Sequence, residues 1–242
     1  MVDTIHIDRG HVKMVAHRGV SGLECENTCA AFVAAGNRSY YGIETDVHVT
    51  ADGKFAVIHD DNTEKVSGVN MSVEGSTWEQ LCTVQLYSGG RVPSYTRRDL
   101  VIPALADYIR ICKRYGKIAV LEVKNRMATE VLRRLVDEVR ELEYLENTLF
   151  ISFSWENMVD LRQMLPNQKM QFLITNWEDD LPERLQQQRL DLDIYHGSLT
   201  RERIELLHDL GIEVNCWTCD DADRAEELIG WGIDYITSNI LE

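Results

Sequence analysis

Residues 42–59, GIETDVHVTADGKFAVIH, contain two strand patterns joined by a turn. Glu44 and Asp46 lie two positions apart in the first strand pattern, so their side chains leave the same face. The Asp-Gly pair at positions 52 and 53 stands between alternating apolar residues, which is a strong hairpin signal. We therefore expect the chain to turn back along the strand that it has just left.

The register of this hairpin has a chemical consequence. A turn centred on Asp52 pairs positions whose numbers sum to roughly 103 or 104. Glu44 then lies opposite His59 or Asp60. The hairpin is thus expected to bring His59 to the two carboxylates.

The remaining apolar segments are short, rich in Val and Ile, and separated by helical patterns, as buried parallel strands with helical crossovers are. Eight such strands are expected, at residues 12–16, 42–47, 118–123, 148–153, 170–175, 192–195, 212–217 and 233–237. Helices are expected at residues 27–36, 103–115, 128–143, 155–165, 181–189, 201–210 and 221–230. Eight strands that alternate with helices predict a closed α/β barrel.

Residues 62–100 do not follow this repeat. They hold scattered Gly, Ser, Thr and charged residues with weak periodicity, over a length that exceeds an ordinary loop between a strand and a helix. We interpret them as an insertion after the second strand that sits over the barrel mouth. Apart from this insertion, residues 1–242 are expected to form a single domain.

Composition and charge limit the possible partners. The chain has 242 residues, of which 44% are hydrophobic, and a formal net charge of −15. This charge disfavours nucleic acid and anionic membrane surfaces, and a phosphate ligand would need locally placed positive charge or a metal. The sequence shows neither a signal peptide nor an apolar run of membrane-spanning length, so we expect a cytoplasmic protein without stable membrane anchoring.

A third acid joins the first two. Glu122 and Lys124 share a face at the end of the strand predicted at 118–123, and a neighbouring barrel strand would place Glu122 beside Glu44 and Asp46. Like charges at this distance raise each other's pKa or recruit a cation, and hard carboxylate oxygens select Mg²⁺ or Ca²⁺. A set of ordinary ion pairs would also account for these residues. The position at carboxyl ends of barrel strands favours the metal, because active sites of such barrels lie on that face.

His17 and Arg18 follow the first predicted strand and belong to the same rim. With His59 they give two histidines at one carboxylate cluster, which suits an acid for a leaving oxygen and a base for an attacking group. Arg18 can clamp phosphate oxygens with two parallel hydrogen bonds. This set indicates metal-assisted cleavage of a phosphate ester, whereas the remaining five histidines are interpreted as structural.

Two further features have open interpretations. Cys216 and Cys219 have the C-x-x-C spacing of a thiol redox motif or half a zinc site, but no second pair or histidine cluster accompanies them, and reduced structural cysteines are favoured. Trp217 ends the strand predicted at 212–217. It is either a core aromatic or a residue that lines the site and contacts the substrate.

The motifs together resemble the glycerophosphodiester phosphodiesterase family. The resemblance rests on an ordered set of six motifs and covers nearly the whole chain, the insertion least; the motifs are Ala16-His17-Arg18-Gly19, Glu26-Asn27-Thr28, Glu44-Thr45-Asp46-Val47, Thr50-Ala51-Asp52-Gly53, His59-Asp60 and Glu122-Val123-Lys124. Two departures, Cys219 in place of an apolar residue and a chain end at 237–241 without a common proline, do not touch the proposed chemistry.

This resemblance implies a TIM (β/α)8 barrel with a small insertion. It also implies a divalent metal on the residues matching Glu44, Asp46 and Glu122. Residues matching His17 and His59 would act as general acid and base, and those matching Arg18 and Lys124 would contact the substrate phosphate.

The expected reaction is metal-dependent hydrolysis of a small-molecule glycerophosphodiester, such as glycerophosphocholine or glycerophosphoethanolamine, to glycerol 3-phosphate and an alcohol. A second hypothesis keeps the chemistry and changes the substrate to a lysophospholipid, cleaved in a lysophospholipase D type reaction. A noncatalytic phosphate-binding barrel and a thiol redox protein are hypotheses of different classes. The preferred metal, the roles of the two histidines, the nucleophile (water or a glycerol hydroxyl) and the oligomeric state stay open.

Overall fold

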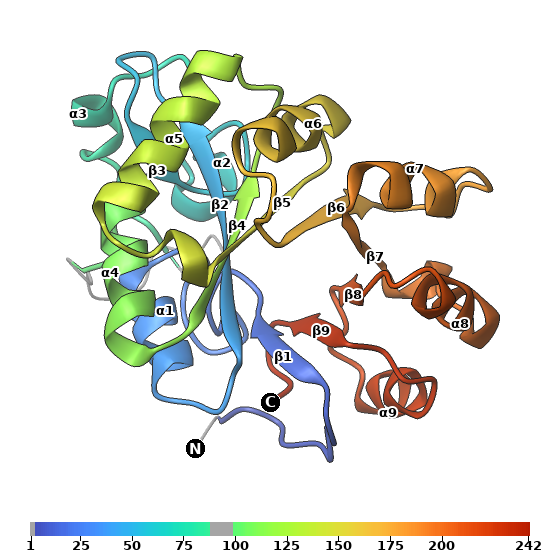
Figure 1. Cartoon of the computed structure of the whole chain (residues 1–242). Helices are drawn as coiled ribbons and strands as arrows, with labels where there is room; N and C mark the ends of the chain where they lie inside the picture. Colours follow the sequence, from blue (N-terminus) through green and yellow to red (C-terminus); the bar gives the residue numbers. More distant parts are fainter. Residues whose placement is uncertain (1–2, 88–98) are drawn as a thin grey trace.

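The computed structural model describes residues 3–87 and 99–242, and it confirms the TIM barrel (Figure 1). Parallel strands form a closed ring in the order β1-β2-β4-β5-β6-β7-β8-β9, because β1 pairs with both β2 and β9. The bounds are β1 Lys13–Ala16, β2 Gly42–Val49, β4 Ile118–Val123, β5 Thr148–Ser152, β6 Met170–Ile174, β7 Asp191–Tyr195, β8 Val214–Trp217 and β9 Tyr235–Ser238.

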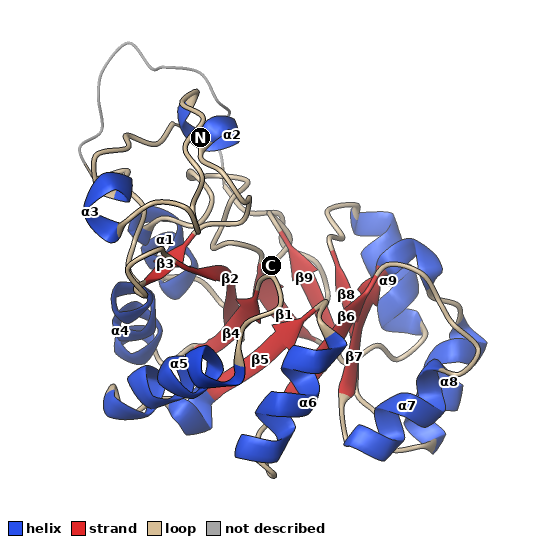
Figure 2. Ribbon diagram, turned by 90° about the horizontal axis from the view of Figure 1, so that it is seen from above, coloured by secondary structure: helices blue, strands red, loops and turns tan. Residues whose placement is uncertain are grey.

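Helices surround the ring on its outside (Figure 2). They are α1 Cys29–Gly36, α4 Leu105–Tyr115, α5 Thr129–Glu141, α6 Trp155–Met164, α7 Leu181–Gln188, α8 Arg201–Asp209 and α9 Ala222–Gly230. Local chemistry fixes several of their ends: Thr28 and Ser154 accept hydrogen bonds from the first turns of α1 and α6, and Gly116 ends α4 at a left-handed φ of 63°. Each helix buries an apolar stripe against the strands, which forms the main core.

The hairpin after β2 is present. Strand β3, Phe55–Val57, pairs antiparallel with the end of β2, and Val47 lies opposite Val57, so paired positions sum to 104. The pairing ends where Ile58 N donates to the Asp46 carbonyl. Glu44 is not paired with His59 or Asp60, because its carbonyl accepts instead from Gly19 N after β1. The expected register of the hairpin is confirmed. The antiparallel pairing, however, ends before it reaches Glu44.

The described part of the insertion packs beside this hairpin. It includes the short helices α2, Glu64–Ser67, and α3, Trp78–Leu81, whose apolar residues form a second small core with Ala56 and Ile58. Glu74 contacts the rim of the barrel at His48. The predicted insertion at 62–100 extends into residues 88–98, which lie outside the described residues, and its placement over the barrel mouth and the single-domain division both stay predictions.

Candidate active site

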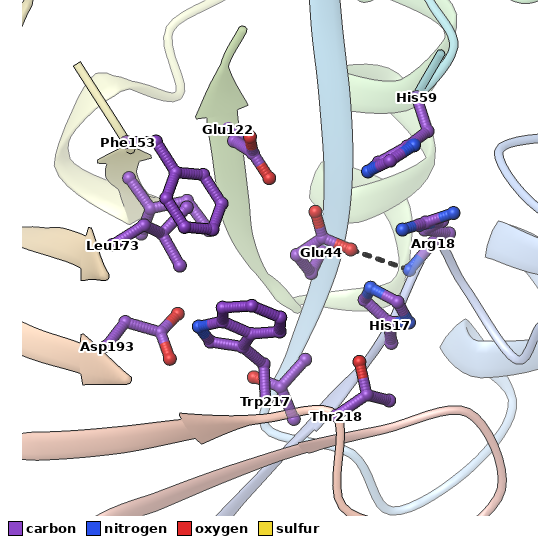
Figure 3. Close-up of a pocket in the computed structure, with 12 residues that line it drawn as sticks. His17, Arg18, Glu44, His59, Glu122, Phe153, Leu173, Asp193, Trp217 and Thr218 are labelled. Atoms are coloured by element: carbon purple, nitrogen blue, oxygen red, sulfur yellow. Dashed lines mark hydrogen bonds between the residues drawn. The ribbon is translucent and has the colours of Figure 1, made fainter. Parts of the chain in front are cut away.

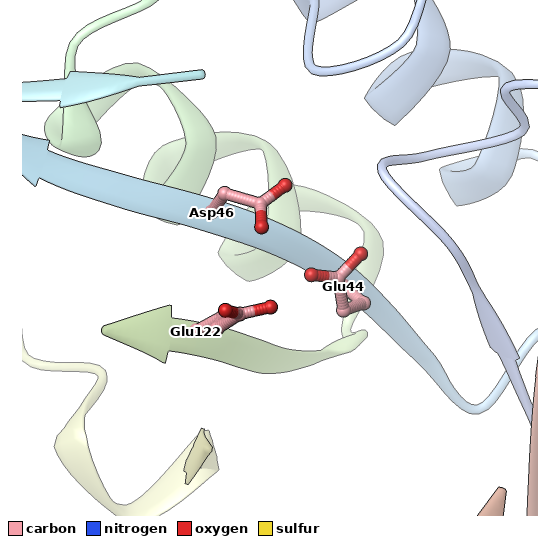
Figure 4. A group of neighbouring side chains, drawn as sticks. All are labelled: Glu44, Asp46 and Glu122. Atoms are coloured by element: carbon pink, nitrogen blue, oxygen red, sulfur yellow. The ribbon is translucent and has the colours of Figure 1, made fainter. Parts of the chain in front are cut away.

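Three carboxylates meet at the carboxyl ends of two neighbouring strands (Figure 4). Asp46 of β2 lies directly opposite Glu122 of β4 in the parallel register, and Glu44 is one inward position earlier on β2. All three are buried, and each offers an oxygen within 4.8 Å of the others. The closure of the barrel thus brings together acids from separate strands.

The pKa values of these three acids are shifted in different directions. Burial and the neighbouring acids raise the pKa of Glu44 well above its usual value, and burial with Asp46 raises the pKa of Glu122 to about 7. Burial opposes ionisation of Asp46 as well, yet the Lys124 and Arg18 cations together hold the pKa of Asp46 below its usual value. Lys124 Nζ lies 3.4 Å from Asp46 Oδ1 and 2.8 Å from Glu122 Oε1.

The donor set fits a hard divalent cation. Asp46 Oδ1 is buried and accepts no hydrogen bond from the residues that the structure describes. Three buried carboxylates from rigid strands supply oxygen ligands of the kind that Mg²⁺ and Ca²⁺ take. A bound cation would also relieve the mutual repulsion of the three groups.

Arg18 stands beside the acids at a sharp corner after β1. Its backbone is left-handed, with φ of 54°, and its N–H donates to Glu44 Oε2 at 2.7 Å. The next residue, Gly19, has φ of 75°, and a Cβ there would lie 2.6 Å from the backbone of Ala31. The guanidinium pairs with Glu26 at 2.8 Å and approaches Asp46 Oδ2 at 3.6 Å. The corner therefore presents a fixed cation beside the carboxylates.

His17 has a defined orientation. Its Nδ1 lies 2.7 Å from Asn239 Oδ1, and Asn239 donates its own amide hydrogen to Asp220 at 2.6 Å. Asn239 Oδ1 is therefore an acceptor toward His17, and His17 Nδ1 carries the proton. Burial and Arg18 lower the pKa of His17 to about 4. The neutral ring thus leaves Nε2 free to accept a proton.

His59 has a different partner. Its Nδ1 lies 2.5 Å from Asp60 Oδ1, so a carboxylate supports the protonated ring. Burial lowers the pKa of His59 overall, although Asp46 acts in the opposite direction. His48, for which the sequence indicates a structural role only, contacts the His59 carbonyl through Nε2 at 3.1 Å and Glu74 through Nδ1. The insertion is thereby connected to the backbone of His59.

These groups line one pocket (Figure 3). One side holds His17, Arg18, Glu44, His59 and Glu122, all of which the sequence predicts at the site. The opposite side is largely apolar and includes Phe153, Leu173 and Trp217, with Asp193 among them. Trp217 therefore borders the pocket in addition to packing edge-on against Phe153, with ring centres 5.5 Å apart.

Four residues at or near this pocket were not predicted from the sequence to have a role in the site. Asn27 and Asp60 stand inside quoted motifs, which is a usable signal, but Asn239 and Asp193 carry none. Asn239 contacts His17 across 222 positions of the chain. Asp193 is one of two acids on β7, and only the closed barrel shows that it borders the pocket.

The cysteine pair does not resemble a redox centre. Cys216 and Cys219 are buried, and burial raises the pKa of Cys216 well above its usual value and that of Cys219 to about 11. A reactive thiol needs a lowered pKa and access to solvent.

Among the described helices, none has the length and apolarity needed to cross a membrane.

Comparison with known proteins points to one family. The model of the "Glycerophosphoryl diester phosphodiesterase family" matches residues 17–241. A curated relative from Caldanaerobacter subterraneus subsp. tengcongensis, named glycerophosphodiester phosphodiesterase, is 24% identical over 239 residues, which cover 93% of each chain.

Solved structures agree in fold. A glycerophosphodiester phosphodiesterase from Parabacteroides distasonis superposes with a TM-score of 0.80 at 25% identity, covering 95% of this chain and 93% of that one. An Oleispira antarctica phosphodiesterase, solved in complex with the product sn-glycerol-3-phosphate, superposes with a TM-score of 0.83 at 21% identity, covering 98% of this chain and 96% of that one.

Proposed function

The chain belongs to the glycerophosphoryl diester phosphodiesterase family, and from this membership we propose that it hydrolyses glycerophosphodiesters in the pocket described above. It is accordingly an enzyme of the phosphoric diester hydrolase class. Glycerophosphocholine and glycerophosphoethanolamine are proposed substrates, with glycerol 3-phosphate and the free alcohol as products. The sn-glycerol-3-phosphate bound by the Oleispira protein supports this product.

One observation carries the proposal. Two histidines, each held through Nδ1 by a different partner, border the same pocket as Glu44 and Glu122, and these two acids form a buried cluster with Asp46. General acid and base catalysis needs one group that donates a proton and one that accepts a proton. A divalent ion needs carboxylate oxygens as ligands. Residues from β2, β4 and the loops after β1 and β3 supply groups suited to both requirements.

Glu44, Asp46 and Glu122 would hold the metal. When bound, Mg²⁺ or Ca²⁺ supplies positive charge that polarises a phosphate oxygen and balances charge that develops during cleavage. Arg18 and Lys124 already stand beside Asp46 and are proposed to bind the remaining phosphate oxygens. In a chain with a net charge of −15, these two side chains provide local attraction for an anionic substrate.

We assign the proton transfers from the partners of the histidines. His17 Nε2 accepts a proton from the attacking hydroxyl, since its Nδ1 proton is committed to Asn239. His59 Nε2 donates a proton to the oxygen of the departing alcohol, since of the two histidines only His59 has a carboxylate, Asp60, against Nδ1 to support the imidazolium form. The new P–O bond forms as the bond to the alcohol breaks, so one proton is taken up and one is released.

The attacking hydroxyl is water or a hydroxyl of the substrate glycerol, and product analysis distinguishes these routes. Direct hydrolysis in H₂¹⁸O places one labelled oxygen in glycerol 3-phosphate at first turnover without a cyclic product. Attack by glycerol gives a cyclic phosphate that early quenching captures. Hydrolysis of lysophosphatidylcholine with no hydrolysis of glycerophosphocholine would contradict the proposed substrate class and favour a lysophospholipase D type reaction. The cytoplasmic location stays a prediction.

A further inference from the structure

Asp193 is a buried acid that the proposed chemistry does not use. It lies on β7, is 1% exposed, and borders the pocket on the wall away from His59 (Figure 3). Its Oδ1 has no hydrogen-bond partner within residues 3–87 and 99–242. Burial and the charge of Glu122 raise the pKa of Asp193 well above its usual value.

A matching donor lies on the next strand. Trp217 of β8 also borders the pocket, and its indole Nε1 is buried without an acceptor in the described part of the chain. Strands β7 and β8 are neighbours, with Asp193 opposite Asn215 and Tyr195 opposite Trp217. In Figure 3 the carboxyl of Asp193 and the indole nitrogen of Trp217 point toward each other along one wall.

Both groups carry an energetic cost as long as they lack partners. A buried acceptor or donor without a partner loses its hydration and gains nothing in return. Asn215, which lies opposite Asp193 on β8, is by contrast paired on both sides, because it donates to Gln171 and accepts from Thr237. Such unpaired groups are uncommon in folded proteins and concentrate at functional sites.

One hydroxyl group would satisfy both residues. It accepts from Trp217 Nε1–H and donates to Asp193 Oδ1, whether that carboxyl is ionised or neutral. Around it, Ile151, Phe153 and Leu173 give an apolar surface suited to a short carbon chain. The pocket therefore has a polar end for the phosphate and a second, mostly apolar end with one hydroxyl-binding position.

We propose that Asp193 and Trp217 bind a hydroxyl of the substrate's glycerol and thereby determine specificity for glycerol-containing diesters. This inference rests on the proposed function. The retained glycerol is assigned to this wall because His59, the proposed acid for the departing alcohol, stands on the opposite side of the pocket and is partly exposed. A hydroxyl of the departing alcohol is a second source of the same chemistry.

Glycerophosphocholine separates these sources, because its choline group has no free hydroxyl. We would compare it with the phosphocholine diesters of propane-1,2-diol and propane-1,3-diol, each of which lacks one glycerol hydroxyl. Asp193→Leu is expected to lower kcat/KM for glycerophosphocholine about 10- to 100-fold, mainly through KM. For the analogue that lacks the bound hydroxyl, the kcat/KM values of wild type and Asp193→Leu should agree within about twofold.

Two further variants sharpen the comparison. Asp193→Asn keeps a hydrogen-bond acceptor and should retain most of the selectivity. Trp217→Phe keeps an aromatic ring but removes the N–H, so it should show the same loss of kcat/KM for glycerophosphocholine as Asp193→Leu. Asp191→Asn is the matched control, because Asp191 is a partly buried acid at the first position of the same strand, where it accepts from Glu213 N and does not border the pocket. This control should leave the ratio of the substrates unchanged.

Stability provides an independent readout. Removing an unpaired buried acid should leave the melting temperature of Asp193→Leu equal to or above that of wild type. A lower melting temperature, or an equal loss on all three diesters, would show a structural role and overturn the inference. Unchanged selectivity among the three diesters in Asp193→Leu would also overturn the inference. It would indicate that Asp193 and Trp217 hold only an internal water molecule.

The proposed function can fail separately. If wild type hydrolyses none of the three diesters, the proposed function is overturned, and the subsite is then tested by calorimetric binding of glycerol 3-phosphate. Weaker binding to Asp193→Leu than to wild type supports the subsite, and equal binding overturns it.

Discussion

Asn27 Nδ2 donates a hydrogen bond of 2.8 Å to Asp46 Oδ2, while Thr45 Oγ1 donates to Asn27 Oδ1 at 2.6 Å. Asn27 is buried and holds a left-handed φ of 54°, so its side chain is fixed from two directions. This contact orients the Asp46 carboxylate and leaves Oδ1 toward the neighbouring acids. The position of a proposed metal ligand thus depends on a residue in the loop before α1.

Changing Asn27 to Asp should weaken metal binding. The variant keeps the shape but replaces an N–H donor with a second carboxyl oxygen against Asp46. Loss of such a supporting hydrogen bond typically lowers metal affinity by about 10- to 100-fold. Calorimetric titration with Mn²⁺ or Ca²⁺ measures this, and Asn37→Asp at the exposed end of α1 is the control. Equal affinity in wild type and both variants would refute the role of Asn27.

The assignment of acid and base predicts a dependence on the leaving group. His59→Ala should lower turnover of glycerophosphocholine by about 10²- to 10⁴-fold, yet lose far less on a glycerophosphodiester of p-nitrophenol, which departs without a proton. His17→Ala should lose activity on both, because the attacking hydroxyl still needs a base. The reverse pattern would exchange the two roles.

Metal should stabilise the fold more at high pH than at low pH. Burial raises the pKa of Glu122 to about 7, so between its unfolded value near 4.5 and about 7 the metal-free folded chain keeps a proton that the unfolded chain releases. Stability of the metal-free protein therefore falls as pH rises through this window. A bound cation replaces the proton and removes that penalty.

Thermal melting with and without Ca²⁺ or Mg²⁺ tests this expectation. The rise in melting temperature should be clearly larger at pH 8 than at pH 5. Glu122→Gln, which cannot ionise, should reduce both the rise and its dependence on pH. A rise of equal size at both pH values would show that the cation binds elsewhere.

Cys216→Ser should leave turnover unchanged. The thiol is buried, and its raised pKa keeps it protonated at neutral pH. Initial rates of the variant and wild type, measured with and without a thiol reductant, provide the comparison. A large loss that follows the reductant would support a thiol redox function instead.

Much of the fold could be predicted because its signals are local. The strand at 118–123 has the predicted bounds, and the Asp-Gly turn indicates the register of β2 and β3, with Val47 opposite Val57. Both depend on neighbouring residues alone. The expected pairing of Glu44 is wrong because Gly19, from a distant corner, already occupies the Glu44 carbonyl.

The candidate site divides in the same way. Glu44 and Asp46 share a strand face by spacing, and their proximity to Glu122 follows once the strands are neighbours. Asn239 and Asp193 could not be predicted, because their importance comes from contacts made only when β7, β8 and β9 close the barrel. Nothing local to the strand shows that Asp193, and not Asp191 of the same strand, borders the pocket.

The most direct test is release of choline from glycerophosphocholine by the purified protein, with Mg²⁺ or Ca²⁺, with a chelator, and with a folded His59→Ala variant. The proposed mechanism predicts turnover that stops with the chelator, returns when the cation is restored and is lost in the variant. Turnover that persists both in chelator and in His59→Ala would contradict it.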